Sequence, residues 1–482
     1  MAFVSFWFYI FLAAVVGIYY ILPIKFRWLA LLAASLGFYW CICDSSIIAF
    51  SILVGMSFVS WILSLLMSKK EKSKKAIFFI LILLIALPLL AFKEFQYIFN
   101  TFFHKSMPLW WIAPIGFSFY TMQLIAYVSD VYQKKTEPEK NYLKFLLFVS
   151  FFPQIIQGPI PRYNQLGKQL VEGHRLDEKK YVKGFMMILW GFFLKLCIAD
   201  KAGIAVDTIF NNFPAYQGFY VLIGGVLYSF QLYADFLACT SFAQGFSGLV
   251  GIDIIDNFAR PYFAVSVKDF WRRWHISLSS WLKDYIYIPL GGNRKGTFIK
   301  YLNILITFAV SGIWHGGGIK FIFWGALHGL YQIFGDILTP VKSKLKSVLK
   351  IKDDSKPLRI FQSLWTFALV MIAWIIFRAD NLKIGLSMIK SMFTVHNIWL
   401  FTDDSLFRLG LEWKEVMILL LCLAVLFAVG LMKEKGIAIR DNILELNIAL
   451  RWGIYIAVIL FIVIFGTYGF GFDAQAFIYG RF

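Results

Sequence analysis

The chain has 482 residues, of which 60% are hydrophobic, 19% aromatic and only 16% charged, and its mean hydropathy is +0.69. A soluble globular chain is about half apolar and about a quarter charged. The 52 Phe, 23 Tyr and 17 Trp exceed what soluble cores of this length can hide. A soluble enzyme, a disordered regulator and a fibrous protein are therefore excluded. The formal net charge of +19 comes from short Lys and Arg clusters between apolar runs, which the positive-inside rule produces, so we do not expect nucleic-acid binding.

Apolar runs of the order needed to cross a hydrocarbon core, about 20 residues, recur along the whole chain. They are Phe3–Leu22, Trp28–Cys43, Ile47–Met67, Ala76–Ala91, Met107–Val128, Tyr181–Ile198, Phe219–Leu237, Phe298–Ile313, Phe321–Leu338, Arg359–Phe377, Val416–Met432 and Ile448–Phe465. Several are short or broken by Gly and Pro, which is tolerated at membrane depth only where protein or a water-filled cavity surrounds them. We expect an all-α polytopic membrane protein with about eleven transmembrane helices plus re-entrant and interfacial helices.

The basic clusters predict the orientation of these helices. Clusters follow the first and third runs and precede the last one, and the rule places them in the cytoplasm. The N-terminus is then outside, and the chain divides into a membrane domain over 1–466 and an extracytoplasmic tail over 467–482. Lys383 and Lys390 fall on an outside segment, so the rule is obeyed imperfectly. The predicted location is the cytoplasmic (inner) membrane.

The segment 257–300 does not have the composition of a membrane span. Eight Lys and Arg stand there against two acidic residues, interleaved with Phe, Trp and Tyr. Basic residues among aromatics are typical of a helix in the interface plane, anchored against lipid. The alternative interpretation is a basic cytoplasmic vestibule that receives an anionic, phosphate-bearing donor.

Two of the six histidines stand where they could carry chemistry. His315 ends an apolar run in Ser-Gly-Ile-Trp-His-Gly-Gly-Gly, and His275 lies within the basic aromatic segment. An ionisable group at membrane depth is costly, and glycines let a substrate approach the backbone closely. An imidazole suits general-base work on a hydroxyl. The alternative for both is a buried, hydrogen-bonded histidine that only holds helices together, which is our interpretation of His328.

No motif predicts a metal or a cofactor. No pair of His stands in the zincin arrangement and no Cys/His cluster has zinc spacing. A Walker loop, a dinucleotide fingerprint and a Gly-x-Ser-x-Gly elbow are also missing from the sequence. We expect no metal and no bound cofactor.

Four segments together resemble a known family. They are Gly116-Phe-Ser-Phe-Tyr-Thr121, Phe152-Pro-Gln-Ile-Ile-Gln-Gly-Pro-Ile-Pro-Arg162, Phe270-Trp-Arg-Arg-Trp-His-Ile-Ser-Leu-Ser-Ser-Trp-Leu-Lys-Asp-Tyr-Ile-Tyr-Ile-Pro-Leu-Gly-Gly-Asn-Arg294 and Ser311-Gly-Ile-Trp-His-Gly316. In this order they resemble the bacterial membrane-bound O-acyltransferases (MBOAT), in particular the alginate and peptidoglycan O-acetyltransferase branch. The stretch Asp235–Ser241 departs from the family's pattern.

The resemblance implies a ring of membrane helices around a thin centre with a central tunnel. It assigns the catalytic role to His315 and a supporting role to His275. It further implies acetyl-CoA as the cytoplasmic donor substrate and an extracytoplasmic partner transferase that acetylates an envelope polysaccharide. Arg272, Arg273 and Arg294 are candidates to bind the donor's phosphates by charge-assisted hydrogen bonds, or to face anionic membrane lipid instead. Two alternatives are D-alanyl transfer to teichoic acid from a carrier protein and a non-enzymatic polytopic transporter.

The end of the chain carries one more candidate. Phe477-Ile-Tyr479-Gly-Arg-Phe482 is similar to the C-terminal motif of a small membrane peptide that accompanies the D-alanylation branch. This similarity implies that Tyr479 relays the acyl group. The alternative is an aromatic terminus that anchors at the membrane interface.

Overall fold

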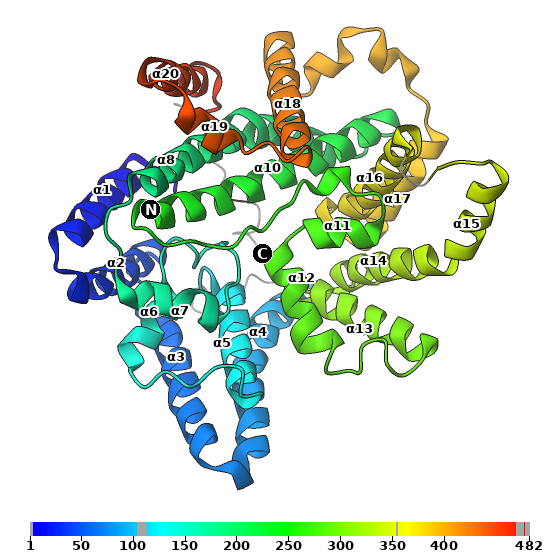
Figure 1. Ribbon diagram of the computed structural model, residues 1–482. Helices are drawn as coiled ribbons and strands as arrows, with labels where there is room; N and C mark the ends of the chain where they lie inside the picture. The colour runs from blue at the N-terminus through cyan, green and yellow to red at the C-terminus, as the bar shows by residue number, and fades with distance from the viewer. Residues whose placement is uncertain (1–2, 104–112, 353–354, 469–476, 478–482) are drawn as a thin grey trace.

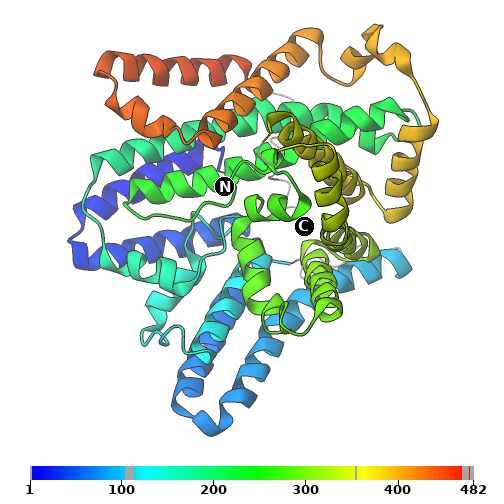
Figure 2. The ribbon, with the colours of Figure 1, turned by 45° about the vertical axis from the view of Figure 1, so that its right-hand side comes forward.

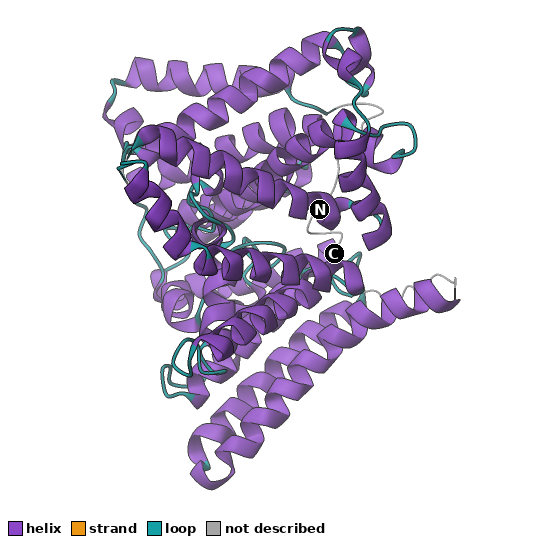
Figure 3. Ribbon diagram, turned by 90° about the vertical axis from the view of Figure 1, so that its right-hand side faces the viewer, coloured by secondary structure: helices purple, strands orange, loops and turns teal. Residues whose placement is uncertain are grey.

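The computed structural model describes residues 3–103, 113–352, 355–468 and 477. These residues form helices joined by loops, and this part of the chain contains no strand (Figure 3). The predicted all-α fold is confirmed for the described residues. Each predicted apolar run lies on a helix, the run over 107–128 only from its fifth described residue, Phe117, where α5 begins.

The N-terminal part contains a long hairpin that projects from the lower edge of the molecule in Figures 1 and 2. Its two arms are α3 and α4, and α5 packs against both of them. Pro88 lies inside α4. The helices of this part are α1 (Phe6–Ile21), α2 (Arg27–Ile42), α3 (Ile47–Lys69), α4 (Lys74–Phe103), α5 (Phe117–Tyr132), α6 (Tyr142–Ser150) and α7 (Tyr163–Glu172).

The longest uninterrupted α-helix of the described chain, α10 (Phe219–Leu249), forms the centre of the core. It packs against α8 (Glu178–Phe192), α9 (Asp200–Asn211) and the π-helical stretch η4 (Phe193–Ala199) that joins those two. Of its most apolar stretch 61% is buried inside the protein, against 11% for α20 (Ile448–Phe465). The small residues of α10 explain this difference, because they allow neighbouring helices to approach closely.

The remaining elements complete the fold around α10. Among them α16 packs on α10, and α18 and α20 form the upper edge in Figures 1 and 2. They are α11 (Val267–Arg273), α12 (Ile276–Leu282), η6 (Lys283–Tyr287), α13 (Thr297–His315), α14 (Ile319–Ile337), α15 (Thr339–Val348), α16 (Lys356–Arg378), α17 (Leu382–Thr394), α18 (Trp413–Glu434) and α19 (Ile439–Glu445).

Eight helices are long and apolar enough to cross a membrane, judged by length and composition over the described residues. They are α3, α4, the continuous helix α8–η4–α9, α10, α13, α16, α18 and α20. Three further helices on apolar runs, α1, α2 and α5, have 16 residues each. At 1.5 Å per residue they reach about 24 Å, less than a hydrocarbon core of about 30 Å. Short helices of this kind require a thinner bilayer around them or protein at their ends.

The basic aromatic segment folds into α11, α12 and η6. Its aromatic side chains and its basic side chains differ in burial. Trp271, Trp274 and Trp281 are buried among other side chains, whereas Lys268 and Arg272 are exposed. The indoles thus pack against protein and not against lipid. The segment contributes aromatic core on one side and a basic surface on the other.

Candidate functional site

The hairpin of α13 and α14 places His315 in the interior. His315 is the last residue of α13 and is 1% exposed. The glycines that follow let the chain reverse at once, and Gly318 has a φ of +94°, which favours glycine. Two more glycines, Gly312 and Gly325, sit where the backbones of the two helices meet, since a Cβ at either would collide with the other helix. The hairpin is therefore packed backbone against backbone immediately before His315.

Aromatic rings fix the orientation of the His315 imidazole. It stacks on Trp324 with ring centroids 4.8 Å apart and meets the edge of Phe377 at 5.6 Å. The indole of Trp314 lies 4.8 Å away on another side. Aromatic neighbours at these distances fix a ring by packing and exclude water from it. A neutral imidazole held in such a pocket can take a proton from a bound hydroxyl.

Lys93, which no sequence motif singles out, reaches the same Trp314–His315 motif from α4. Its ammonium donates a hydrogen bond to the carbonyl oxygen of Trp314 and lies 5.4 Å from the centroid of that indole. The next residue, Glu94, accepts a hydrogen bond from the backbone N–H of Gly318 at 3.3 Å. A charged pair at the end of an apolar run was the available signal, because such groups at membrane depth are functional candidates. Lys93 holds the end of α13 in place.

His275 occupies a sharp break between α11 and α12. Its backbone has a φ of 44°, in the left-handed region, and its side chain is fully buried. Asn257 stabilises this break: its side-chain oxygen accepts from the backbone N–H of Ser277 at 3.0 Å and from the Ser277 hydroxyl at 2.8 Å. Its own backbone oxygen accepts from Ile276 N at 2.9 Å. Asn257, on the loop between α10 and α11, is a second site residue that no sequence motif singles out.

Asn257 also selects the tautomer of His275. The His275 Nδ1 lies 3.3 Å from the Asn257 oxygen, which is already an acceptor, so the network assigns the proton to Nδ1. The lone pair is then on Nε2, which has no hydrogen-bond partner among the described residues. Burial lowers the pKa of His275 to about 3, so the ring is neutral at physiological pH. The arrangement provides a buried, uncharged acceptor.

Trp314 connects the two candidate histidines. Its ring centroid lies 6.0 Å from that of His275, edge to face, and 4.8 Å from that of His315. The structure thus brings both histidines into contact with one indole. His328, in contrast, accepts a hydrogen bond from Trp271 Nε1 at 3.2 Å through its Nδ1. This contact fits the structural interpretation of His328.

The candidate donor-binding arginines lie apart from this pocket and in different states. Arg272 and Arg294 are exposed. Arg273 is bound on both sides: its Nε is 3.1 Å from Asp269 and its Nη1 is 3.1 Å from both oxygens of Glu434 on α18. Arg272 and Arg294 are therefore accessible to an anionic ligand, whereas Arg273 already joins α11 to α18.

A buried ion triad joins η4 and α9 to α10, and its α10 member is adjacent in sequence to a residue that contacts His275. Lys195 of η4 is 2.8 Å from Asp200 and 2.8 Å from Asp235, and each of the three side chains is at most 3% exposed. Asp235 begins the stretch that departs from the family pattern, and the adjacent Phe236 packs on His275 at 4.7 Å. The acidic residue of the divergent stretch thus balances a buried lysine.

Phe477 also reaches the triad. Its ring lies 4.8 Å from the Lys195 ammonium and is 8% exposed. It meets Phe3 and Phe242 edge to face at 6.3 and 6.4 Å. The candidate relay Tyr479, two residues further on, lies outside the described residues.

Comparison with known proteins decides the family. The membrane-bound O-acyltransferase family profile matches residues 139–348. A probable alginate O-acetylase AlgI of Pseudomonas aeruginosa is 34% identical over 436 residues, covering 88% of this chain and 80% of its own. The chain belongs to the membrane-bound O-acyltransferase family. The resemblance drawn from the motifs is confirmed.

Two further relatives of this MBOAT protein match shorter stretches. A probable alginate O-acetylase AlgI of Pseudomonas putida is 37% identical over 65% of this chain and 62% of its own length. A peptidoglycan O-acetyltransferase of Helicobacter pylori is 33% identical over 60% of this chain and 58% of its own. The chain thus spans about three-fifths of the length of these two relatives. The profile match over 139–348 includes both candidate histidines and excludes Lys93 and Phe477.

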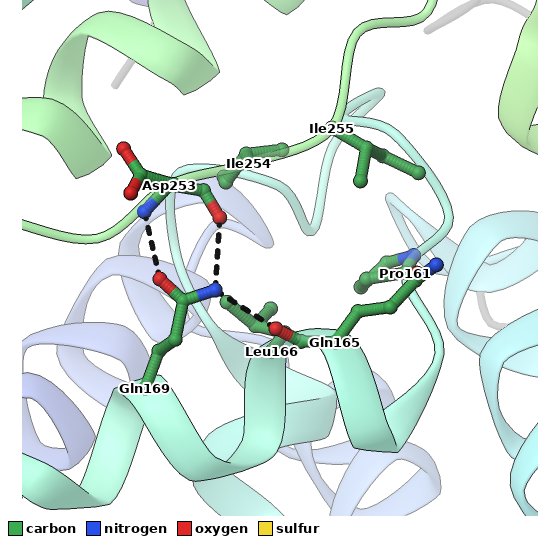
Figure 4. A pocket seen from close by; sticks show the side chains of 7 residues that line it. All are labelled: Pro161, Gln165, Leu166, Gln169, Asp253, Ile254 and Ile255. Carbon is green, nitrogen blue, oxygen red and sulfur yellow. Dashed lines mark hydrogen bonds between the residues drawn. The ribbon is translucent and has the colours of Figure 1, made fainter.

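A small pocket near α7 lies outside this arrangement. It has a volume of about 260 Å³ and is lined by Pro161, Gln165, Leu166, Gln169, Asp253, Ile254 and Ile255 (Figure 4). The Gln169 amide donates to the backbone oxygens of Gln165 and Asp253 at 2.8 and 3.2 Å, and its oxygen accepts from Asp253 N at 3.0 Å. These bonds tie α7 to the loop after α10, and none of the lining residues belongs to the histidine pocket.

Proposed function

We propose that this MBOAT protein is an O-acetyltransferase of the cytoplasmic membrane. It takes acetyl groups from a cytoplasmic donor, acetyl-CoA, and moves them across the membrane for O-acetylation of a cell-envelope or secreted polysaccharide. The burial of His315 at the end of α13, held by Trp324, Phe377 and Lys93, is the observation that carries the proposal. The relatives, a probable alginate O-acetylase and a peptidoglycan O-acetyltransferase, support the acetyl group and the polysaccharide class.

In the proposed reaction His315 acts as the general base. Its imidazole takes the proton of a hydroxyl nucleophile as the oxygen attacks the thioester carbonyl carbon. The carbon–sulfur bond of the donor then breaks, and the proton passes from the imidazolium to the leaving thiolate, so that free CoA and an acetyl ester result. His275, whose ring packs against the same indole and whose Nε2 has no hydrogen-bond partner among the described residues, is a supporting residue that orients the acyl group.

The donor is cytoplasmic and the polysaccharide lies on the other side of the membrane, so the acetyl group requires a path through the protein. We place the helices in a ring around a tunnel, with both termini outside and the segment 257–300 at the cytoplasmic interface. The exposed Arg272 and Arg294 bind the donor's phosphates there, and Arg273 fixes the local structure through Glu434. A separate extracytoplasmic transferase is the partner that completes the transfer to the polymer.

Tyr479 is the proposed relay across this path. A CoA thioester cannot cross the membrane, so a nucleophile on the far side has to take the acetyl group. A tyrosine hydroxyl is a weak nucleophile at neutral pH and needs a base such as His315. Burial of Phe477 against Lys195, close to the α10 contacts of His275, supports a tail that enters the protein.

Release of CoA by the purified full-length protein in nanodiscs tests the base. Acetyl-CoA is supplied, and free thiol is measured for the parent and for His315→Ala. The variant is expected to lose about 10²–10⁴-fold in rate, the usual contribution of one general base. His396→Ala, a change at an exposed histidine, serves as the matched control and keeps full activity. Parent-level activity in a folded His315→Ala protein would contradict the assignment.

The donor and the relay have their own tests. A D-alanyl carrier protein offered in place of acetyl-CoA distinguishes the D-alanyl alternative, and thioester consumption in neither arm favours the non-enzymatic transporter. Tyr479→Phe keeps the ring and removes the hydroxyl, so polymer acetylation is expected to vanish and the acetyl adduct, visible by intact mass in the parent, to disappear. Tyr468→Phe, at an exposed tyrosine, is the control. Normal acetylation by Tyr479→Phe would contradict the relay and leave only the alternative, an aromatic terminus that anchors at the membrane interface.

A further inference from the structure

A second cavity, larger than the pocket at α7, opens between the last helices and the core. It has a volume of about 730 Å³, within the range of about 300–1,000 Å³ that ligand pockets occupy. Its walls come from α8, α10, α18, α19 and α20. We call it the α18–α20 groove. Both helices pack against η4, and only 22% of the apolar stretch of α18 and 11% of that of α20 are buried.

The walls of the groove are apolar at the depth of the hydrocarbon. Val425 and Val429 of α18 line it together with Val458 and Phe461 of α20. Val425 is 38% exposed, so the groove is open to the surroundings of the helices. Within a bilayer those surroundings are acyl chains, and an apolar space without partner atoms loses its dispersion contacts. A hydrocarbon chain is the occupant that restores them.

One end of the groove is basic. Gly436, with a φ of +80°, reverses the chain between α18 and α19 and brings Lys433 and Arg440 to the same mouth. Neither of these two residues has an ion pair among the described residues. The other charges at the mouth are mostly neutralised: Arg260 is 2.6 Å from Glu434, and Asp441 is paired with Lys183.

The remaining acidic group at this end is Asp256, whose carboxylate accepts from the Gln244 amide at 2.7 Å. Lys433 and Arg440 against Asp256 leave a surplus of one positive charge. A phosphodiester carries one negative charge and accepts charge-assisted hydrogen bonds from ammonium and guanidinium groups. The mouth therefore complements a phosphate in charge as well as in donor type.

We propose that the α18–α20 groove is a binding site for one anionic glycerophospholipid. Its phosphate lies at Lys433 and Arg440, and an acyl chain runs between α18 and α20. The wall from Leu421 to Lys433 spans twelve residues, about 18 Å of helix rise, which accommodates most of an acyl chain. The lipid fills the space that would otherwise separate the two outer helices from the core.

The inner wall gives this lipid a position next to the candidate site. Tyr233 and Phe258 line the groove and also pack on Trp274, at centroid distances of 6.0 and 5.0 Å. Trp274 directly precedes His275. The bound lipid thus supports the aromatic layer behind His275, and the groove is separate from the pocket that the proposed function uses.

Native mass spectrometry of the full-length protein in detergent tests the site. The protein is titrated with phosphatidylglycerol and, in parallel, with phosphatidylcholine of the same acyl chains. One phosphatidylglycerol is expected to bind at least tenfold more tightly than phosphatidylcholine, because each basic residue at an anionic lipid surface strengthens binding by about fivefold. The double variant Lys433→Gln/Arg440→Gln loses this preference, whereas Lys342→Gln/Lys344→Gln on α15, at exposed lysines, retains it.

A second variant covers the case in which the charge changes disturb folding. Val429→Trp fills the groove without changing any charge and is expected to remove the bound phosphatidylglycerol. Phosphatidylglycerol binding by Val429→Trp at the parent level, or equal binding of the two lipids by the parent, would overturn the proposal. Displacement of phosphatidylglycerol by acetyl-CoA would also overturn it and assign the groove to the donor. No arm depends on acyl transfer, so failure here is distinguishable from failure of the proposed function.

Discussion

Replacement of Gly325 by alanine tests whether the α13–α14 hairpin positions His315. A methyl group at Gly325 would lie 3.0 Å from the Phe308 carbonyl carbon, and closer still to its oxygen. It would also lie 3.3 Å from the backbone nitrogen of Gly312. These are backbone atoms of α13, which cannot rotate away as the end of a flexible side chain can. The two helices therefore have to separate until the methyl group reaches an ordinary contact of 3.4–4 Å.

The size of the effect follows from two opposing contributions. Alanine within a helix is favoured over glycine by about 0.8–1.0 kcal/mol, so propensity alone predicts a more stable protein. Overpacking of a well-packed interior costs about 1–3 kcal/mol, and the contact with backbone places Gly325→Ala at the upper end. We expect a net loss of about 2 kcal/mol. Because His315 follows Gly312 by less than one turn, a displacement of about 1 Å is also expected to lower acetyl transfer by about 10²-fold.

Gly335→Ala on the same helix supplies the matched control. Nothing lies within 4 Å of a methyl group at that position, so the helix-propensity gain acts alone and the melting temperature is expected to rise. Melting of the detergent-purified variants is followed by intrinsic fluorescence, and CoA release is measured alongside. Opposite shifts for the two substitutions support close packing. A Gly325→Ala protein that melts at or above the parent temperature would refute the reasoning.

Three more predictions concern the charges and the break at His275. Lys195→Met leaves two buried carboxylates without their cation and is expected to cost about 3–5 kcal/mol, seen as early melting that Asp235→Asn partly restores; an unchanged melt would show that the triad contributes nothing. Asn257→Leu removes three hydrogen bonds at the break, so CoA release should fall while Asn293→Leu, at an exposed site, leaves it intact. Burial lowers the pKa of His275 from 6.5 to about 3, so the folded protein has its full stability above pH 6.5 and loses stability as the pH drops toward 3. At pH 5 the loss of stability amounts to roughly 2 kcal/mol. Melting of His275→Gln should therefore depend less on pH than melting of the parent.

Local sequence was sufficient for most of the helices, and it singled out the two candidate histidines, whose catalytic roles stay predictions. Apolar runs indicate helices because each run places its side chains against protein or against lipid, whichever elements lie beside it. His315 and His275 were visible because ionisable residues beside Gly and Trp are conspicuous in apolar sequence. The split of the segment 257–300 into a buried aromatic face and an exposed basic face was not predictable, because composition does not say which partner a helix face meets.

The residues that the sequence did not reveal each contact a partner on another element of the fold. Asn257 is recognisable only once the loop that carries it lies against the break at His275, and Lys93 only once α4 crosses the end of α13. The pairing of Lys195 with Asp235 joins positions 40 residues apart. Periodicity and motif spacing describe one element at a time, so contacts of this kind follow from tertiary packing and not from local pattern.

The π-helical turn η4 sets a constraint on chain length. Lys195 and Asp200 are five residues apart, and the wide turn of a π-helix, with its i to i+5 hydrogen bonds, brings them to one side. In an ordinary α-helix the same two positions would point about 140° apart. If the same seven residues, Phe193–Ala199, formed a regular α-helix instead, all of α9 would be rotated relative to α8. The wide turn of η4 thus fixes the register of α9 relative to α8. The number of residues in η4 therefore matters more than the identity of its apolar residues.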